Sequence, residues 1–222
     1  MNILVTGGAG FIGSNLCEQL SKKHKIFSLD DYSSGSIDNH INGVSYINAK
    51  TKDIFEHIDF KIDLIFHLGE YSRVEQSFDD IEKVIESNIY GTSAVLEFWR
   101  ERKCKLVYAG SSTKFSDDGS GKNQSPYAYS KSSNTELVKN YGSWYDLPYA
   151  ITYFYNVYGR REIENGGYAT LIALFKQKYL DKEDLTVGKF GFTHTYGIFY
   201  FTAELDTENR EIYQLGFRFN LK

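Results

Sequence analysis

A glycine-rich turn near the start of the chain limits the possible folds more than any other feature. The apolar, β-branched run Asn2 to Thr6 predicts a short strand, and Gly7, Gly10 and Gly13 follow it directly. From Phe11 to Lys22 the apolar residues recur at helical spacing. A strand that turns so tightly into a helix needs glycines, because side chains would block both the turn and the close packing of helix on strand.

An acidic pair, Asp30 and Asp31, ends the second predicted strand, Lys25 to Leu29. Free N–H groups at the start of the first helix attract the phosphates of a dinucleotide. A carboxylate at Asp30 would accept hydrogen bonds from the adenosine ribose and repel a 2′-phosphate, which favours NAD over NADP. The alternative is a tight turn without a ligand. The residues expected to bind NAD here are Gly7, Gly10, Phe11, Ile12, Gly13, Asp30 and Asp31.

Strands and helices alternate along the rest of the chain. Further strands are predicted at Val44 to Ile47, Leu64 to Leu68, Lys105 to Ala109 and Tyr149 to Tyr155. Helices are predicted at about Asp79 to Arg102, Ser125 to Tyr141 and Tyr168 to Leu180. This alternation, with nearly continuous apolar strands, predicts an α/β fold with a doubly wound parallel sheet, the Rossmann fold.

The last part of the chain differs in character from the rest. It is aromatic and shows no helical period, and the runs Ile198 to Leu205 and Glu211 to Phe219 predict a β-hairpin. We therefore expect a Rossmann domain over residues 1–187 and a small, divergent β-like appendage over residues 188–222.

Composition excludes several classes of partner. The formal net charge of -4 provides no basic field for nucleic acid, and no apolar run approaches the length of a membrane span. Cys17 and Cys104 lie far apart in the sequence, without metal-ligand spacing. We expect buried free thiols, no metal, no nucleic-acid or membrane partner, and a reducing compartment such as the cytoplasm.

A Tyr-x-x-x-Lys pair lies on the helix predicted from Ser125 to Tyr141. Its spacing places Tyr127 and Lys131 on one helix face and directs Tyr129 elsewhere. An ammonium group beside a phenol favours the phenolate, which suits Tyr127 to acid/base chemistry. Taken alone, such a pair is more often a surface contact than a site, so its surroundings have to decide.

Those surroundings resemble the extended short-chain dehydrogenase/reductase family, in its branch of NAD-dependent nucleotide-sugar epimerases and dehydratases. The resemblance covers about residues 1–187. It implies that Tyr127 is the general acid/base, that Lys131 holds the nicotinamide ribose, and that Ser111 is their hydroxyl partner, with Ser112 and Thr113 as close alternatives. The motifs that carry it are Thr6–Gly13, His67-Leu68-Gly69, Asn88 with Gly91-Thr92, Ala109–Ser112, Ser125–Lys131 and Tyr155–Arg160.

Further roles follow from the same resemblance. His67, Leu68 and Asn88 are expected beside the cofactor, together with Tyr127 and Lys131. Structural roles are the alternatives for His67 and Asn88, and a strand-end cap is the alternative for Asn156. The residues expected to contact the sugar nucleotide are Ser111, Ser112 and Asn156.

The implied reaction is epimerisation of a nucleotide sugar through a keto-sugar intermediate. Tyr127 would remove a proton from a sugar hydroxyl while hydride passes to NAD, and the hydride would return to the other face. Dehydratases of this branch carry an Asp-Glu pair where this chain has Ser112 and Thr113. A UDP-sugar 4-epimerase, serving polysaccharide biosynthesis, is therefore favoured over a dehydratase or reductase, and a catalytically incomplete NAD-binding remnant is a further alternative. The resemblance also implies a homodimer formed through the helix of Tyr127.

The chain departs from the family pattern in three places. Asn48-Ala49-Lys50 stands where the family has an Asp that contacts adenine. Glu70 and Tyr71 replace small residues, which puts a charged and a bulky group beside the nicotinamide pocket. Beyond Val187 the chain is shorter than family members and differs from the part that supplies much of their sugar pocket.

Overall fold

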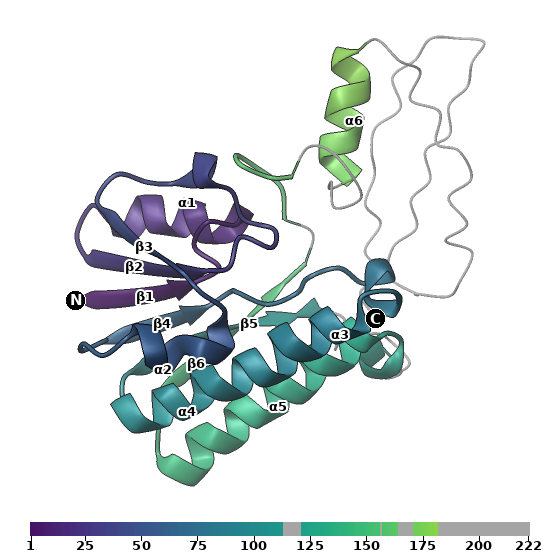
Figure 1. The fold of residues 1–222 in the computed structure, drawn as a ribbon. Helices are drawn as coiled ribbons and strands as arrows, with labels where there is room; N and C mark the ends of the chain where they lie inside the picture. Colours follow the sequence, from purple (N-terminus) through teal and green to yellow (C-terminus); the bar gives the residue numbers. More distant parts are fainter. Residues whose placement is uncertain (113–120, 156, 164–170, 182–222) are drawn as a thin grey trace, which may run out of the picture.

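The computed structural model describes residues 1–112, 121–155, 157–163 and 171–181 of the chain. One parallel sheet with the strand order β3-β2-β1-β4-β5-β6 lies between helices on both faces (Figure 1). This confirms the predicted doubly wound α/β fold. The strands are β1 (Asn2–Thr6), β2 (Lys25–Asp30), β3 (Val44–Asn48), β4 (Leu64–His67), β5 (Lys105–Ser111) and β6 (Tyr149–Phe154).

The helices follow the predicted pattern with one local change. A π-helical segment joins α3 to α4, so the helix predicted from Asp79 to Arg102 is a continuous run with one widened stretch. The turn Thr51–Asp53 and α2 are too short to show a period in the sequence. The helices are α1 (Phe11–Leu20), α2 (Ile54–His57), α3 (Ile81–Val84), α4 (Thr92–Arg102), α5 (Pro126–Tyr145) and α6 (Leu171–Leu180), and the π-helical segment is Ile85–Gly91.

Both faces of the sheet are buried at the inner strands β1, β2, β4 and β5, which explains their nearly continuous apolar sequences. Ile3 and Val5 of β1 pack with Cys17 of α1 on one face. Leu4, between them in sequence, packs on the opposite face against the larger cluster that includes Trp99 of α4. Strand residues alternate between the two faces, so each helical layer receives its own set of side chains.

The two cysteines are free and buried, as predicted. Burial raises the pKa of Cys17 to about 12 and that of Cys104 to about 11, so both are neutral thiols inside the core. Within the described ranges, no helix is both long and apolar enough to cross a membrane. The predicted hairpin after Ile198, together with Thr113 and Asn156, lies outside the described residues.

The strand order decides where a ligand can bind. β1 pairs with β2 on one side and with β4 on the other, so the chain changes direction across the sheet at this point. In open parallel sheets, ligands bind beyond the carboxyl ends of the strands at such a switch point. The glycine turn after β1, Asp30 at the end of β2 and Ser111 at the end of β5 all lie at this edge.

Candidate cofactor and catalytic site

The glycine turn leaves an open cradle at the start of α1. A Cβ atom on Gly7, whose φ is +73°, would lie 2.8 Å from Cα of Gly69, and one on Gly13 would lie 2.0 Å from the carbonyl oxygen of Gly7. Gly10 precedes α1 and provides no side-chain cap for its first N–H groups. Small residues, close backbone and uncapped donors fit the diphosphate of a dinucleotide.

Asp30 ties this turn to the loop after β2. Its Oδ2 atom accepts a hydrogen bond from the Ala9 N–H at 2.8 Å, and its Oδ1 atom accepts one from the Tyr32 N–H at 2.9 Å. Burial raises the pKa of Asp30, although the two N–H donors oppose this effect. Each carboxylate oxygen keeps further acceptor capacity for ribose hydroxyls. Asp31, by contrast, is exposed and accepts a hydrogen bond from the Ser33 N–H.

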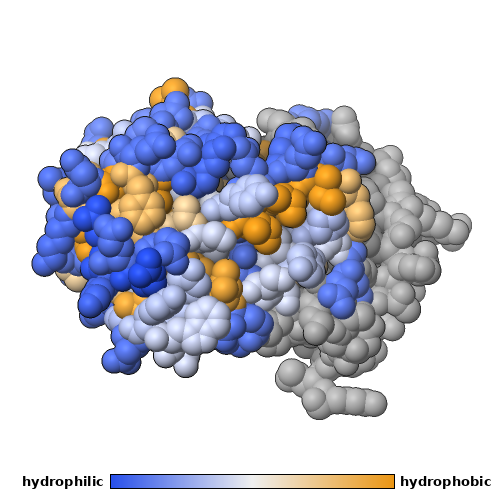
Figure 2. All heavy atoms as spheres, turned by 60° about the horizontal axis from the view of Figure 1, so that its bottom comes forward, coloured by the Kyte–Doolittle hydropathy of each residue, from blue (hydrophilic) through white to orange (hydrophobic). Residues whose placement is uncertain are grey.

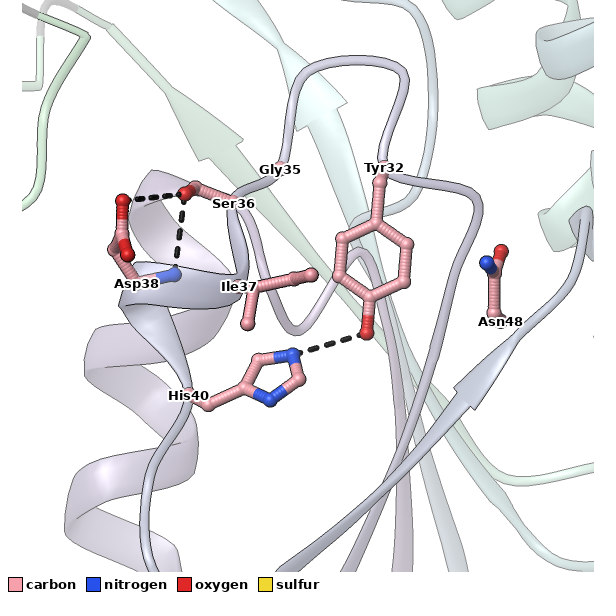
Figure 3. A pocket seen from close by; sticks show the side chains of 7 residues that line it. All are labelled: Tyr32, Gly35, Ser36, Ile37, Asp38, His40 and Asn48. Atoms are coloured by element: carbon pink, nitrogen blue, oxygen red, sulfur yellow. Dashed lines mark hydrogen bonds between the residues drawn. The ribbon is translucent and has the colours of Figure 1, made fainter.

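A hollow of about 520 Å³ lies at the ends of β2 and β3 (Figure 3). Tyr32 extends toward His40, and the Tyr32 hydroxyl lies 2.9 Å from Nε2 of His40. Asn48 lines the hollow, whereas Lys50 pairs with a glutamate of the π-helical segment. Asn48 and Lys50 both belong to the segment that stands where the family has its adenine-contacting Asp. Of these two residues, Asn48 borders the hollow. Its lining residues are Tyr32, Gly35, Ser36, Ile37, Asp38, His40 and Asn48.

His67, at the end of β4, is fully buried. Its Nδ1 atom lies 2.7 Å from the Thr6 hydroxyl and its Nε2 atom lies 2.9 Å from the Thr92 hydroxyl. Burial lowers the pKa of His67 to about 4, so the ring is neutral at neutral pH. The Thr6 oxygen also accepts the N–H groups of Leu68 and Gly69. His67 thus supports the backbone around the glycine turn, with both ring nitrogens bonded inside the protein.

The Tyr-x-x-x-Lys pair lies in the first turns of α5. Ser125 caps this helix, because its Oγ atom accepts the Ala128 N–H at 3.0 Å. Lys131 is buried, and its Nζ atom donates to the carbonyl oxygen of Ala109 at 2.5 Å. Tyr127 is half-buried, whereas Tyr129 is exposed, as the helical spacing predicts.

The end of β5 carries the predicted hydroxyl partner. Ser111 is the last residue of this strand and is buried, and Ser112 follows it half-buried. Since Lys131 bonds to Ala109, two residues before Ser111, α5 and the end of β5 are held together at this edge of the sheet. Lys131, Ser111 and the glycine turn therefore lie at the same edge of the sheet, where the strands have their carboxyl ends.

Asn88 lies in the π-helical segment and connects that segment to its neighbours. Its Oδ1 atom accepts the Tyr71 N–H at 2.7 Å, and its Nδ2 group donates to the Ser130 hydroxyl at 2.9 Å. The side chain is fully buried. In this structure Asn88 fastens the loop after β4 to α5. A contact of Asn88 with the cofactor stays a prediction.

Glu70 also belongs to the site, although the sequence identified it only as a departure from the family pattern. Its carboxylate forms an ion pair with Lys131, and the two side chains are 3% and 6% exposed. A charged residue just after a buried strand was the signal available in the sequence. The partner was not predictable, because Lys131 follows 61 residues later.

The sequence matches the model of a family described as the NAD dependent epimerase/dehydratase family, over residues 3–194. A putative UDP-glucose 4-epimerase of Methanocaldococcus jannaschii is 32% identical over 82% of this chain and 64% of its own length. A dTDP-D-glucose 4,6-dehydratase of Dictyostelium discoideum is 35% identical over 72% of this chain and 44% of its own length. The chain therefore spans less than two thirds of these relatives.

Solved structures share the fold. The UDP-glucose 4-epimerase of Thermus thermophilus, in complex with NAD, superposes with a TM-score of 0.72 at 27% sequence identity. The superposition covers 83% of this chain and 64% of that protein.

Proposed function

Because the chain belongs to the NAD dependent epimerase/dehydratase family, we propose that it binds NAD and epimerises a nucleotide sugar, most specifically a UDP-sugar at C4. The observation that carries this proposal is the position of Lys131, whose ammonium group is buried against the end of β5, one helical turn from the half-buried Tyr127. That arrangement matches the roles expected for the pair. Residues 1–187 would form the cofactor domain.

In the proposed reaction Tyr127 accepts the proton of a sugar hydroxyl and later returns it. Bound NAD would supply the acceptor and donor of the hydride of that carbon. Lys131 holds the nicotinamide ribose, and Ser111 binds the reacting hydroxyl. Gly7, Gly10 and Gly13 give the diphosphate access to the N-terminus of α1. Phe11, Ile12, Asp30, Asp31, Leu68, Ser112 and Asn156 complete the proposed contacts.

A dehydratase is the second candidate, because one relative with 35% identity carries that name. Dehydration requires an acid and a base besides Tyr127, since water has to leave the sugar. The described residue that follows Ser111 is Ser112, a hydroxyl that supplies neither group near neutral pH. This position favours the epimerase.

The test begins with calorimetry of the 222-residue chain with NAD and with a panel of UDP-, dTDP- and GDP-sugars. We expect NAD and one UDP-sugar to bind, and the epimeric sugar to accumulate on incubation. The variant Tyr127→Phe should bind NAD normally and epimerise at least about 100-fold more slowly, because it lacks the proton acceptor.

Tyr129→Phe is the matched control, since this exposed tyrosine lies two residues further along the same helix. It should retain full activity. Binding of NAD without any sugar would contradict the epimerase proposal for this chain and leave a cofactor-binding protein. An unchanged rate in Tyr127→Phe would remove Tyr127 from the mechanism.

A further inference from the structure

The proposed reaction makes no direct use of Glu70, although its carboxylate is buried at the centre of the site. Glu70 and Lys131 are almost completely enclosed, with side chains 3% and 6% exposed. Removing two charges from water is costly, and an apolar pair often serves stability equally well. A small residue at position 70 would avoid this cost. The buried pair therefore suggests a role other than stability.

The surroundings of Glu70 orient its carboxylate toward Lys131. Three uncharged donors bind the Oε1 atom: the Thr92 hydroxyl at 2.9 Å, the Tyr108 hydroxyl at 3.1 Å and the Asn134 amide at 2.9 Å. They come from α4, β5 and α5. With Oε1 occupied in this way, the other oxygen, Oε2, faces the ammonium group of Lys131.

A chain of hydrogen bonds also links Glu70 to the glycine turn. A carboxylate only accepts, so the Thr92 hydroxyl donates to Glu70. The Thr92 oxygen then accepts the Nε2–H group of His67, and Nδ1 of the neutral ring accepts the hydroxyl of Thr6 at the end of β1. Glu70 is thereby held in a defined position relative to the strand that leads into Gly7.

Lys131 has a second acceptor besides Glu70, the carbonyl oxygen of Ala109 at 2.5 Å. An ammonium group has three N–H donors, so one donor remains for a further ligand. We propose that Glu70 is the fixed counter-ion of Lys131, which positions this ammonium group for the nicotinamide ribose and keeps it charged. The part that concerns the ribose rests on the function proposed above.

Among the described residues, the titratable groups of β4 and β5 that face the pair are neutral. Burial is the largest single effect and raises the pKa of Glu70, but the ammonium group of Lys131, together with His67 and the hydrogen bond from Asn134, holds this pKa below its ordinary value. Burial and the charge of Glu70 raise the pKa of Tyr108 well above the ordinary value, so this β5 phenol stays neutral. His67 of β4 is neutral as well, and Tyr127 is the titratable neighbour within α5.

The experiment measures NAD affinity of the full chain by calorimetry, from about pH 6 to about pH 9.5, a range that spans the loss of a proton from a destabilised ammonium group. Wild-type affinity should stay nearly constant. In Glu70→Gln we expect the affinity for NAD to fall about ten-fold near neutral pH, because one charged hydrogen bond is lost. The affinity should fall further as the pH rises. A buried ammonium group without a counter-charge gives up its proton more readily.

Two comparisons separate positioning from a general structural role. Lys131→Met should weaken NAD binding at every pH, and adding Glu70→Gln to it should have no further effect, because Glu70 acts through Lys131. Glu97→Gln is the matched control, since Glu97 also binds a tyrosine hydroxyl and a basic side chain but has a side chain that is 39% exposed. It should bind NAD like the wild type.

Wild-type affinity and pH dependence in a folded Glu70→Gln variant, verified by circular dichroism, would overturn the proposal. The proposal would also be overturned if Glu70→Gln lowered the affinity for NAD equally in the wild-type background and in Lys131→Met. If Glu70→Gln does not fold, a measurement on the wild-type protein tests the proposal instead.

That measurement is nitrogen-15 NMR of the lysine side chains in the absence of cofactor. The signal of Lys131 is the one that is missing from the spectrum of Lys131→Met. We expect a charged Lys131 ammonium group whose hydrogens exchange slowly with water, because Glu70 and Ala109 hold them. Rapid exchange, or a neutral amine, would overturn the proposal even if NAD binds. A slowly exchanging ammonium group in a chain that does not bind NAD would support the counter-ion and contradict the proposed function.

Discussion

At the scale of single residues, the site depends on polar groups that are buried and hydrogen-bonded to one another. His67 is the clearest case, because its ring bridges hydroxyls at the ends of two neighbouring elements, β1 and α4. Protonation would give both ring nitrogens a hydrogen, and Nδ1 would then lose its acceptor role toward Thr6. Burial already lowers the pKa of His67 from 6.5 to about 4.

This shift predicts an acid-sensitive contribution to stability. An unfolded histidine binds a proton near pH 6.5, but folded His67 does so only near pH 4, so the contribution is complete above pH 6.5 and is lost as pH falls toward 4. The free energy of unfolding should drop by up to about 3 kcal/mol over this window from His67 alone. Urea unfolding at a series of pH values measures it.

In His67→Gln the free energy of unfolding should fall less between pH 6.5 and pH 4 than in the wild type, by the contribution of His67. His57→Gln provides the control, because His57 is exposed and its replacement should leave the dependence as it is in the wild type. Parallel curves for the wild type and His67→Gln would show that His67 titrates normally in the folded protein.

At the scale of elements, α5 carries the residues proposed for chemistry within its first two turns. This helix is well started: Ser125 caps it through the Ala128 N–H, and Pro126 occupies its first turn, where a missing N–H costs nothing. Helix ends fray more readily than helix centres, so the cap matters both for stability and for the position of Tyr127.

Ser125→Ala should therefore cost about 1 kcal/mol of unfolding free energy, the usual value for a lost N-cap. It should also weaken NAD binding, because Lys131 lies on the turns that the cap stabilises. Ser132→Ala, in the interior of the same helix, should be neutral or slightly stabilising, since alanine is the better helix former. Denaturant unfolding measures the stability of both variants, and calorimetry measures their affinity for NAD. Equal effects of Ser125→Ala and Ser132→Ala on these two quantities would argue against a role for the cap.

At the scale of the whole molecule, the face that carries α4 and α5 exposes apolar side chains. Figure 2 brings forward the side on which α4 and α5 lie in Figure 1, and apolar atoms run across it among polar ones. Tyr129, Trp144 and Tyr145 of α5 are 57%, 61% and 47% exposed. Exposed aromatic side chains along one helix are typical of association surfaces.

We therefore expect a homodimer in solution that buries this face, and light scattering of the eluting protein measures its mass. Replacing Tyr129 and Trp144 together by lysine should yield a monomer, because each protomer would have to bury two charges at the interface. Ile37→Lys is the control, since Ile37 is 71% exposed but lies in the loop after β2. A wild-type monomer, or a dimer that survives the double substitution, would contradict the assignment.

Local patterns in the sequence were sufficient for the fold, the family and the cofactor class. The glycine turn, the strand–helix alternation and Asp30 depend on neighbours close in the chain, and the family match over residues 3–194 confirms the predicted family with its cofactor, NAD. The six-stranded parallel sheet was predictable for the same reason, because each strand and helix has its own periodicity.

Only the tertiary structure decided which buried polar groups meet. Glu70 faces Lys131, His67 bridges Thr6 and Thr92, and Asp30 holds the glycine turn through Ala9, all across long stretches of chain. Periodicity reports which face of an element is buried, but not which side chain of another element it meets there. For a buried charge that partner determines its protonation state, and so the part it can play in chemistry.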